Sequence, residues 1–139
     1  MHEVVLDTNV LVSALRSKRG ASYELLRSID EGLWRPNISV ALALEYEDVL
    51  KRSDLVVGFS ETEIEYFLDY ILGQGNLITG VQRRRPLLPD ADDERILELA
   101  IASGSMIVTH NTRHFTAADL FGVEVATPAQ FLRTLRSGK

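Results

Sequence analysis

The stretch Val4-Val5-Leu6-Asp7-Thr8-Asn9-Val10 decides how the chain begins to fold. Its apolar, β-branched start is typical of a buried strand, here from Glu3 to Asp7. Apolar residues then recur at helical spacing, at positions 10, 11, 14 and 15. The stretch therefore predicts a strand that leads directly into a helix, with Asp7 at the junction.

The alternation of strands and helices continues along the chain. Caps, apolar spacing and glycines predict further helices at 22–32, 39–54, 60–75, 90–104 and from 127 onward. Short extended segments are predicted at 34–37, 77–81, 106–109 and 123–126. Strands that alternate with helices pair in parallel through right-handed crossovers. We expect an α/β fold, a three-layer α/β/α domain with a central parallel sheet, formed by residues 1–139 as one domain.

The composition is that of an ordinary globular protein, with 45% hydrophobic and 25% charged residues. No apolar run approaches the ~20 residues that cross a bilayer, and the N-terminus lacks the basic start of a secretory signal. We therefore expect a soluble, cytoplasmic protein without membrane contact. The absence of cysteine excludes disulfides, zinc–thiolate sites and a cysteine nucleophile. Oxygen or imidazole ligands must hold any metal.

The net charge of -5 does not predict strong nonspecific binding to nucleic acid. The one dense basic run is Arg83-Arg84-Arg85. A solvated loop is the favoured interpretation of this run, and a rim that contacts phosphate groups is the alternative.

Two acidic residues occupy informative positions. Asp7 should project into the crevice beyond the carboxyl ends of the strands, where such sheets bind ligands, although a helix N-cap explains it equally well. Glu45 lies at the edge of the apolar stripe of its helix, whereas Glu47 and Asp48 lie on the solvent side. Because burial of an unpaired charge is costly, Glu45 needs a salt bridge or a bound cation.

A third acidic position lies at the start of the helix predicted at 90–104. Asp93 shares a helix face with apolar residues at 96, 97 and 100 and should point inward, whereas Asp92 and Glu94 should point outward. Favourable charge at a helix N-terminus explains any one of these acids. It does not explain why one of them faces the core.

A polar segment, Thr109 to His114, directly follows the strand predicted at 106–109 and shares the same sheet edge. Asn111 could orient a water or a carboxylate, and His114 could bind a metal or titrate, with a plain surface role as the alternative. Converging carboxylates suit Mg²⁺ or Mn²⁺, which polarise phosphoryl oxygens and activate water. The pattern therefore favours phosphodiester hydrolysis.

These residues resemble the motifs of PIN-domain nucleases, and among them the VapC-like toxin components of toxin–antitoxin pairs. Residues 4–10 are similar to the family's opening motif, and Glu45 falls at its mid-helix glutamate. Asp93 fits the third acidic motif. Residues 107–115, Ile-Val-Thr-His-Asn-Thr-Arg-His-Phe, match the fourth.

The resemblance implies a metal-dependent endoribonuclease and, as its partners, an RNA substrate, a cognate antitoxin and a second copy in a homodimer. It implies that Asp7, Glu45 and Asp93 are the catalytic residues and bind Mg²⁺ or Mn²⁺. The candidates for supporting these ligands or binding substrate are Thr8, Asn9, Asp90, Thr109, Asn111 and His114.

One position departs from the family pattern, because His114 stands where many relatives have Asp or Glu. The loss of a carboxylate removes one negative charge, which should weaken or displace a second metal ion. Asp90 or Asp119 could replace that carboxylate.

Other functions fit the residues less well. A haloacid-dehalogenase-type phosphatase needs an acid where Asn9 stands, a receiver-like role lacks its paired acids, and neither glycine-rich nucleotide-binding motif occurs. The remaining alternative is a noncatalytic PIN module that binds RNA or a protein partner, and His114 is its main support. Retention of three carboxylates favours activity.

Overall fold

The computed structural model of the protein describes residues 1–52, 54–83 and 88–138. Arg84 and Arg85 of the basic run lie outside these residues, and Arg83 is exposed. Within the described ranges, no helix has the length and apolar character needed to cross a membrane.

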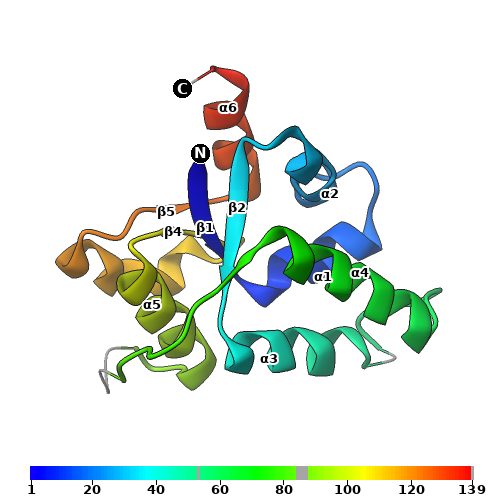
Figure 1. The fold of residues 1–139 in the computed structure, drawn as a ribbon, viewed down its shortest axis with the longest axis horizontal. Coiled ribbons are helices and arrows are strands. Elements are labelled where there is room, and N and C mark those ends of the chain that lie inside the picture. Colours follow the sequence, from blue (N-terminus) through cyan, green and yellow to red (C-terminus); the bar gives the residue numbers. More distant parts are fainter. Residues whose placement is uncertain (53, 84–87, 139) are drawn as a thin grey trace.

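A parallel sheet of five strands forms the centre of the fold (Figure 1). Its order is β3-β2-β1-β4-β5, and every pair of neighbours is parallel. The strands are β1 (His2–Leu6), β2 (Trp34–Ile38), β3 (Asn76–Leu77), β4 (Met106–Val108) and β5 (Val125–Ala126). The expected α/β fold with a central parallel sheet is confirmed.

Helices cover both faces of this sheet. The first four are α1 (Thr8–Arg16), α2 (Ala21–Arg27), α3 (Val40–Leu50) and α4 (Glu61–Gln74); the later ones are α5 (Ala91–Ser103) and α6 (Pro128–Arg136). Two 3₁₀ helices are η1 (Ser28–Glu31) and η2 (Thr112–Phe121). Right-handed crossovers in this strand order place α1 to α4 on one face and α5 with η2 on the other. In Figure 1, strands β1 and β2 separate α5 from α1 and α4.

The apolar strands and the inner helix faces share one core. Val4, Val5 and Leu6 of β1 are fully buried, as expected for a central strand that is covered on both faces. The predicted caps also form: Ser60 and Thr127 each begin a helix with a capping box. These local signals fix where α4 and α6 begin.

Several boundaries differ from the sequence prediction. The edge strand β3 has only two residues, because it pairs only with the last two residues of β2. The third helix ends at Leu50 rather than near 54, and the second continues as the 3₁₀ helix η1. Residues 112–121, to which the sequence assigned no element, form η2 with a kink at Phe115.

Candidate active site

The order of the strands reverses at β1. From β1 the chain passes to β2 and β3 on one side, and β4 and β5 lie on the other side. At the carboxyl end of this junction, the amide of Asp7 donates to the carbonyl of Val108 over 2.9 Å. Open α/β sheets bind ligands in the crevice outside such a reversal. The strand order therefore places Asp7 and the residues after β4 at the expected ligand-binding edge.

Thr109 connects several of the predicted residues around Asp7. Its hydroxyl, which is fully buried, donates to Asp7 Oδ2 over 2.7 Å. The hydroxyl oxygen of Thr109, Oγ1, also accepts from the backbone amide of Asn111 (2.9 Å) and, more weakly, from Asn9 Nδ2 (3.5 Å). Asn9 Oδ1 in turn accepts from the amide of His110. Thr109, Asn9 and Asn111 thus hold one carboxylate in place, Asn111 through its backbone.

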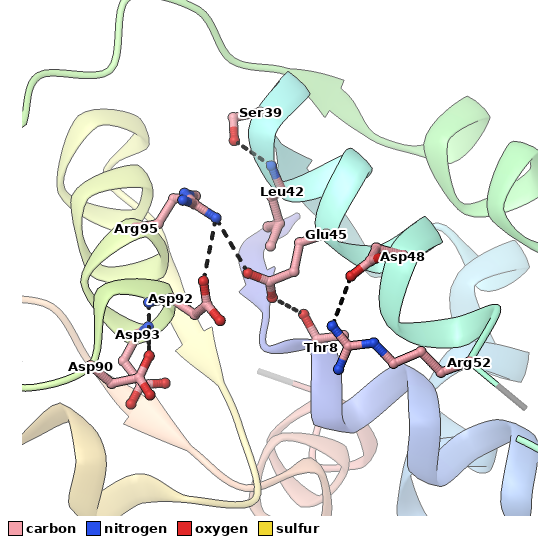
Figure 2. Close-up of polar contacts among 10 residues, drawn as sticks. All are labelled: Thr8, Ser39, Leu42, Glu45, Asp48, Arg52, Asp90, Asp92, Asp93 and Arg95. Atoms are coloured by element: carbon pink, nitrogen blue, oxygen red, sulfur yellow. Dashed lines mark hydrogen bonds and ion pairs between the residues drawn. The ribbon is translucent and has the colours of Figure 1, made fainter. Parts of the chain in front are cut away.

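Glu45 reaches from α3 toward the start of α1 and toward α5 (Figure 2). The Thr8 hydroxyl donates to its Oε2, and Arg95 Nη1 lies 3.5 Å from its Oε1. Arg95 divides its charge, because Asp92 Oδ1 lies at the same distance. The side chain of Glu45 is only 12% exposed. The sequence-based expectation that this carboxylate needs a partner is met by a hydroxyl and a shared arginine.

Asp93 contacts His114 rather than a lysine or arginine. Its Oδ2 lies 3.2 Å from His114 Nδ1, and its side chain is 16% exposed against 54% for the imidazole. One turn back, Asp90 caps α5: its Oδ1 accepts from the amides of Asp92 and Asp93 (Figure 2). The cap fixes the start of the helix that carries Asp93.

The three candidate ligands share one electrostatic environment. Burial raises the pKa of Asp7 above its usual value. Hydrogen bonds from the Thr109 hydroxyl and from the amides of Thr8 and Asn9, together with the charge of His114, lower this pKa but do not cancel the effect of burial. Burial also raises the pKa of Glu45 and of Asp93, and in both the negative charge of Asp7 raises it further. Asp7 therefore repels both other carboxylates, and a proton or a cation would relieve the repulsion.

A ready-made cage is not present in this arrangement. Among the described residues, no three acidic or histidine side chains stand together as a group that could hold a metal ion. The carboxylates are turned instead to Thr109, Arg95 and His114. Their chemistry nevertheless fits a hard divalent cation, since all three offer oxygen, lie at one sheet edge and have raised pKa values.

Three expectations for neighbouring acids can be compared with the structure. Asp92 is exposed, as expected, but the prediction that Glu94 points outward is wrong: its residue is only 3% exposed. Glu94 accepts from the amide of Leu88 over 3.4 Å, so it faces the chain that leads into α5. Asp119 is exposed on η2, whereas Asp90 lies near enough to Asp93 to raise its pKa.

Sequence reasoning missed two residues that hold the site. Arg95 pairs with Glu45 across the gap between α5 and α3, and its spacing to Asp92 was the available signal. The fully buried Tyr46 donates its hydroxyl to the carbonyl of Leu6 over 2.6 Å, which ties α3 to the end of β1. No pattern around Tyr46 identifies this long-range partner.

Comparison of the sequence with protein families places the geometry in context. The PIN domain family matches residues 3–113, which include the three candidate ligands Asp7, Glu45 and Asp93 but not His114. The chain belongs to the PIN domain family. The resemblance seen in the sequence is thereby confirmed at the level of the family.

Solved structures of other proteins share the fold. VapBC2 from Rickettsia felis, bound to a promoter DNA fragment, gives a TM-score of 0.60 at 16% identity over 90% of this chain and 98% of that chain. VapBC-1 from nontypeable Haemophilus influenzae gives 0.63 at 12% identity over 91% and 98%. FitAB bound to the IR36 DNA fragment gives 0.59 at 19% identity over 90% and 94%. No curated protein is significantly similar in sequence.

Proposed function

We propose that this PIN protein is a metal-dependent endoribonuclease, acting in the cytoplasm as the toxin of a toxin–antitoxin pair. The observation that carries the proposal is electrostatic: Asp7 lies at the sheet edge where the strand order reverses, and its negative charge raises the pKa of Glu45 on α3 and of Asp93 on α5. A fold without catalytic use gains nothing from gathering carboxylates that repel one another.

In this proposal Asp7, Glu45 and Asp93 hold Mg²⁺ or Mn²⁺. The ion supplies positive charge that stabilises the phosphoryl oxygens during hydrolysis. For the cation to bind, Glu45 must release Arg95 and Asp93 must release His114. Both partners are weak, since Arg95 is 3.5 Å away and shared and His114 is largely exposed.

The supporting residues act by holding the carboxylates. Thr109 orients Asp7 through Oδ2, and Thr8 orients Glu45 through Oε2. In this proposal an acidic residue, Asp7 or Asp93, helps to orient or deprotonate the attacking water. Hydrolysis by water needs no covalent intermediate with the protein.

The partners follow from the relatives. Structures with the same fold are named as VapBC and FitAB pairs, which supports a cognate antitoxin for this chain. We extend the proposal to a homodimer. A second function, a noncatalytic PIN module that binds RNA or protein, is favoured by one observation: an imidazole, His114, stands against Asp93 where many relatives have a carboxylate.

Cleavage of RNA in Mn²⁺ by the wild type and by Asp7→Asn separates the two functions. We expect the substitution to lower the rate by more than about 100-fold, the upper end of what loss of a residue that only supports a metal ligand costs. Asp48→Asn, which alters an exposed carboxylate on α3, is the matched control and should cleave normally. Equal cleavage by wild type and Asp7→Asn would refute catalysis at this site, and no cleavage by either would favour the binding module.

A further inference from the structure

A pocket of about 420 Å³ opens beside Asp93. One wall is formed by Leu88 and Pro89, which precede α5, and the other by residues at the start of η2, among them Arg113 and Thr116. Asp93 and His114 line the pocket as well. The pocket is therefore continuous with the candidate active site, and its volume lies in the usual range for small-molecule sites.

Arg95 and Arg113 both lie beside the carboxylates, but they differ in how many hydrogen-bond donors remain for a ligand. Arg95 is engaged by Glu45 and Asp92. Arg113 is exposed and forms no ion pair with any residue that the structure describes. A guanidinium in this state keeps its whole fork of donors for a phosphate, which it can bind through two parallel hydrogen bonds.

Leu88 and Pro89 give another part of the pocket lining a different chemistry. Leu88 and Pro89 offer apolar surface, against which the face of an unstacked base can pack. Thr116 adds an exposed hydroxyl on the side of Arg113. A cation and a hydroxyl on one wall and an apolar surface on the other suit a nucleotide, which is anionic at one end and flat and apolar at the other.

We infer that this pocket holds the nucleotide next to the cleaved bond, with Arg113 on its phosphate and the wall of Leu88 and Pro89 against its base. The inference rests on the proposed function for the identity of the substrate as RNA. Beyond the proposed function, it identifies which part of the RNA contacts this pocket, and it identifies Arg113 as a residue that binds the RNA. It also explains how a protein with a net charge of -5 can hold an RNA strand beside three carboxylates.

Binding is measured in the cleavage-deficient Asp7→Asn protein, so that the RNA stays intact. Fluorescence anisotropy with a labelled single-stranded RNA gives Kd over a range of salt concentrations. We expect Arg113→Ala to raise Kd about tenfold and to reduce the slope of log Kd against log salt by about 1, as for one lost phosphate contact. Arg133→Ala, an exposed arginine on α6, is the matched control and should leave both unchanged.

A second variant fills the pocket. Thr116→Trp replaces an exposed residue, so the core is not disturbed. In the otherwise wild-type enzyme, sequencing of the cleaved ends should show altered base preference at one position next to the cut and unchanged preference elsewhere. A failure of the nuclease proposal can be distinguished from a failure of the pocket proposal, because the binding assay needs no cleavage.

The outcomes decide between the ideas. If the wild type cuts no RNA but Arg113→Ala weakens binding as stated, the nuclease proposal fails and the pocket stands. If RNA is cut but Arg113→Ala behaves like Arg133→Ala and Thr116→Trp leaves the cut sites unchanged, the pocket assignment is overturned. It is equally overturned if the Asp7→Asn protein binds no RNA.

Discussion

At the scale of a single residue, burial disfavours the charged form of the Asp7 side chain. Burial raises its pKa, and Thr109 compensates only in part. A carboxyl whose folded pKa exceeds its unfolded value of about 4 contributes stability below that value, and loses this contribution as pH rises through the folded pKa. The free energy of unfolding of the metal-free protein should therefore depend on pH through the ionisation of Asp7.

We expect Asp7→Asn to become more stable relative to the wild type as pH rises from about 4 to 7, because asparagine stays neutral while Asp7 ionises. Thr109 can still donate to the oxygen of an asparagine. Urea unfolding in EDTA at several pH values gives the difference in free energy. A difference that is constant across this range would contradict the assignment of a raised pKa to Asp7.

Elements position the site through their ends. Asp90 accepts from two amides at the first turn of α5, and Asp93 lies on that turn. Ser60 plays the corresponding part at the start of α4, which carries none of the candidate ligands. Removal of the Ser60 cap should affect only the stability of the fold, whereas removal of the Asp90 cap should affect both stability and the position of Asp93.

We expect Asp90→Ala and Ser60→Ala each to lower the free energy of unfolding by about 1 kcal/mol, the usual cost of losing an N-cap. Only Asp90→Ala should also weaken Mn²⁺ binding, measured by titration calorimetry, because it loosens the turn that holds Asp93. Asp90→Asn keeps a capping side chain and should restore stability. Equal Mn²⁺ affinity in wild type and Asp90→Ala would limit the role of Asp90 to the cap.

The junction between α4 and β3 depends on a close approach. A Cβ on Gly75 would lie 2.6 Å from the carbonyl oxygen of Pro36 in β2, whereas a Cβ on Gly73, inside α4, would meet nothing within 4 Å. Gly75→Ala should therefore destabilise the protein by about 1–3 kcal/mol through overpacking. Gly73→Ala should stabilise it by up to about 1 kcal/mol through helix propensity. Thermal and urea unfolding of both variants test the pair; similar effects of the two substitutions would refute the steric reason.

At the scale of the whole molecule, the candidate site is a property of the assembled sheet. Asp7 comes from the end of β1, Glu45 from α3 and Asp93 from α5. They approach one another because the sheet places β1 beside both β2 and β4. The three side chains are near one another only in the folded protein, so a cation that binds all three should raise the free energy of unfolding.

We expect millimolar Mn²⁺ to raise Tm by a few degrees, since binding at ten times Kd adds about 1.4 kcal/mol to the free energy of unfolding. The gain should shrink in Asp93→Asn, which removes one ligand, and persist in Asp48→Asn, which alters an exposed side chain. Differential scanning calorimetry with and without the ion gives the shifts. An identical gain in all three proteins would place the ion elsewhere.

Local sequence was sufficient to predict strand β1, the N-cap serine of α4 and the position of Asp7 at the end of a strand. Each of these depends on residues within a few positions of one another, through backbone geometry and capping. The family motifs also indicated Glu45 and Asp93 as companions of Asp7. The contacts of these residues were beyond the reach of local pattern.

Long-range packing decided the rest. Glu45 pairs with Arg95, and Asp93 with His114, because helices from distant parts of the chain meet at one sheet edge. Whether a carboxylate is solvated, paired or repelled depends on neighbours that lie tens of residues away in the sequence, and on the water that their packing excludes. Those neighbours exist only once the strands have taken their order.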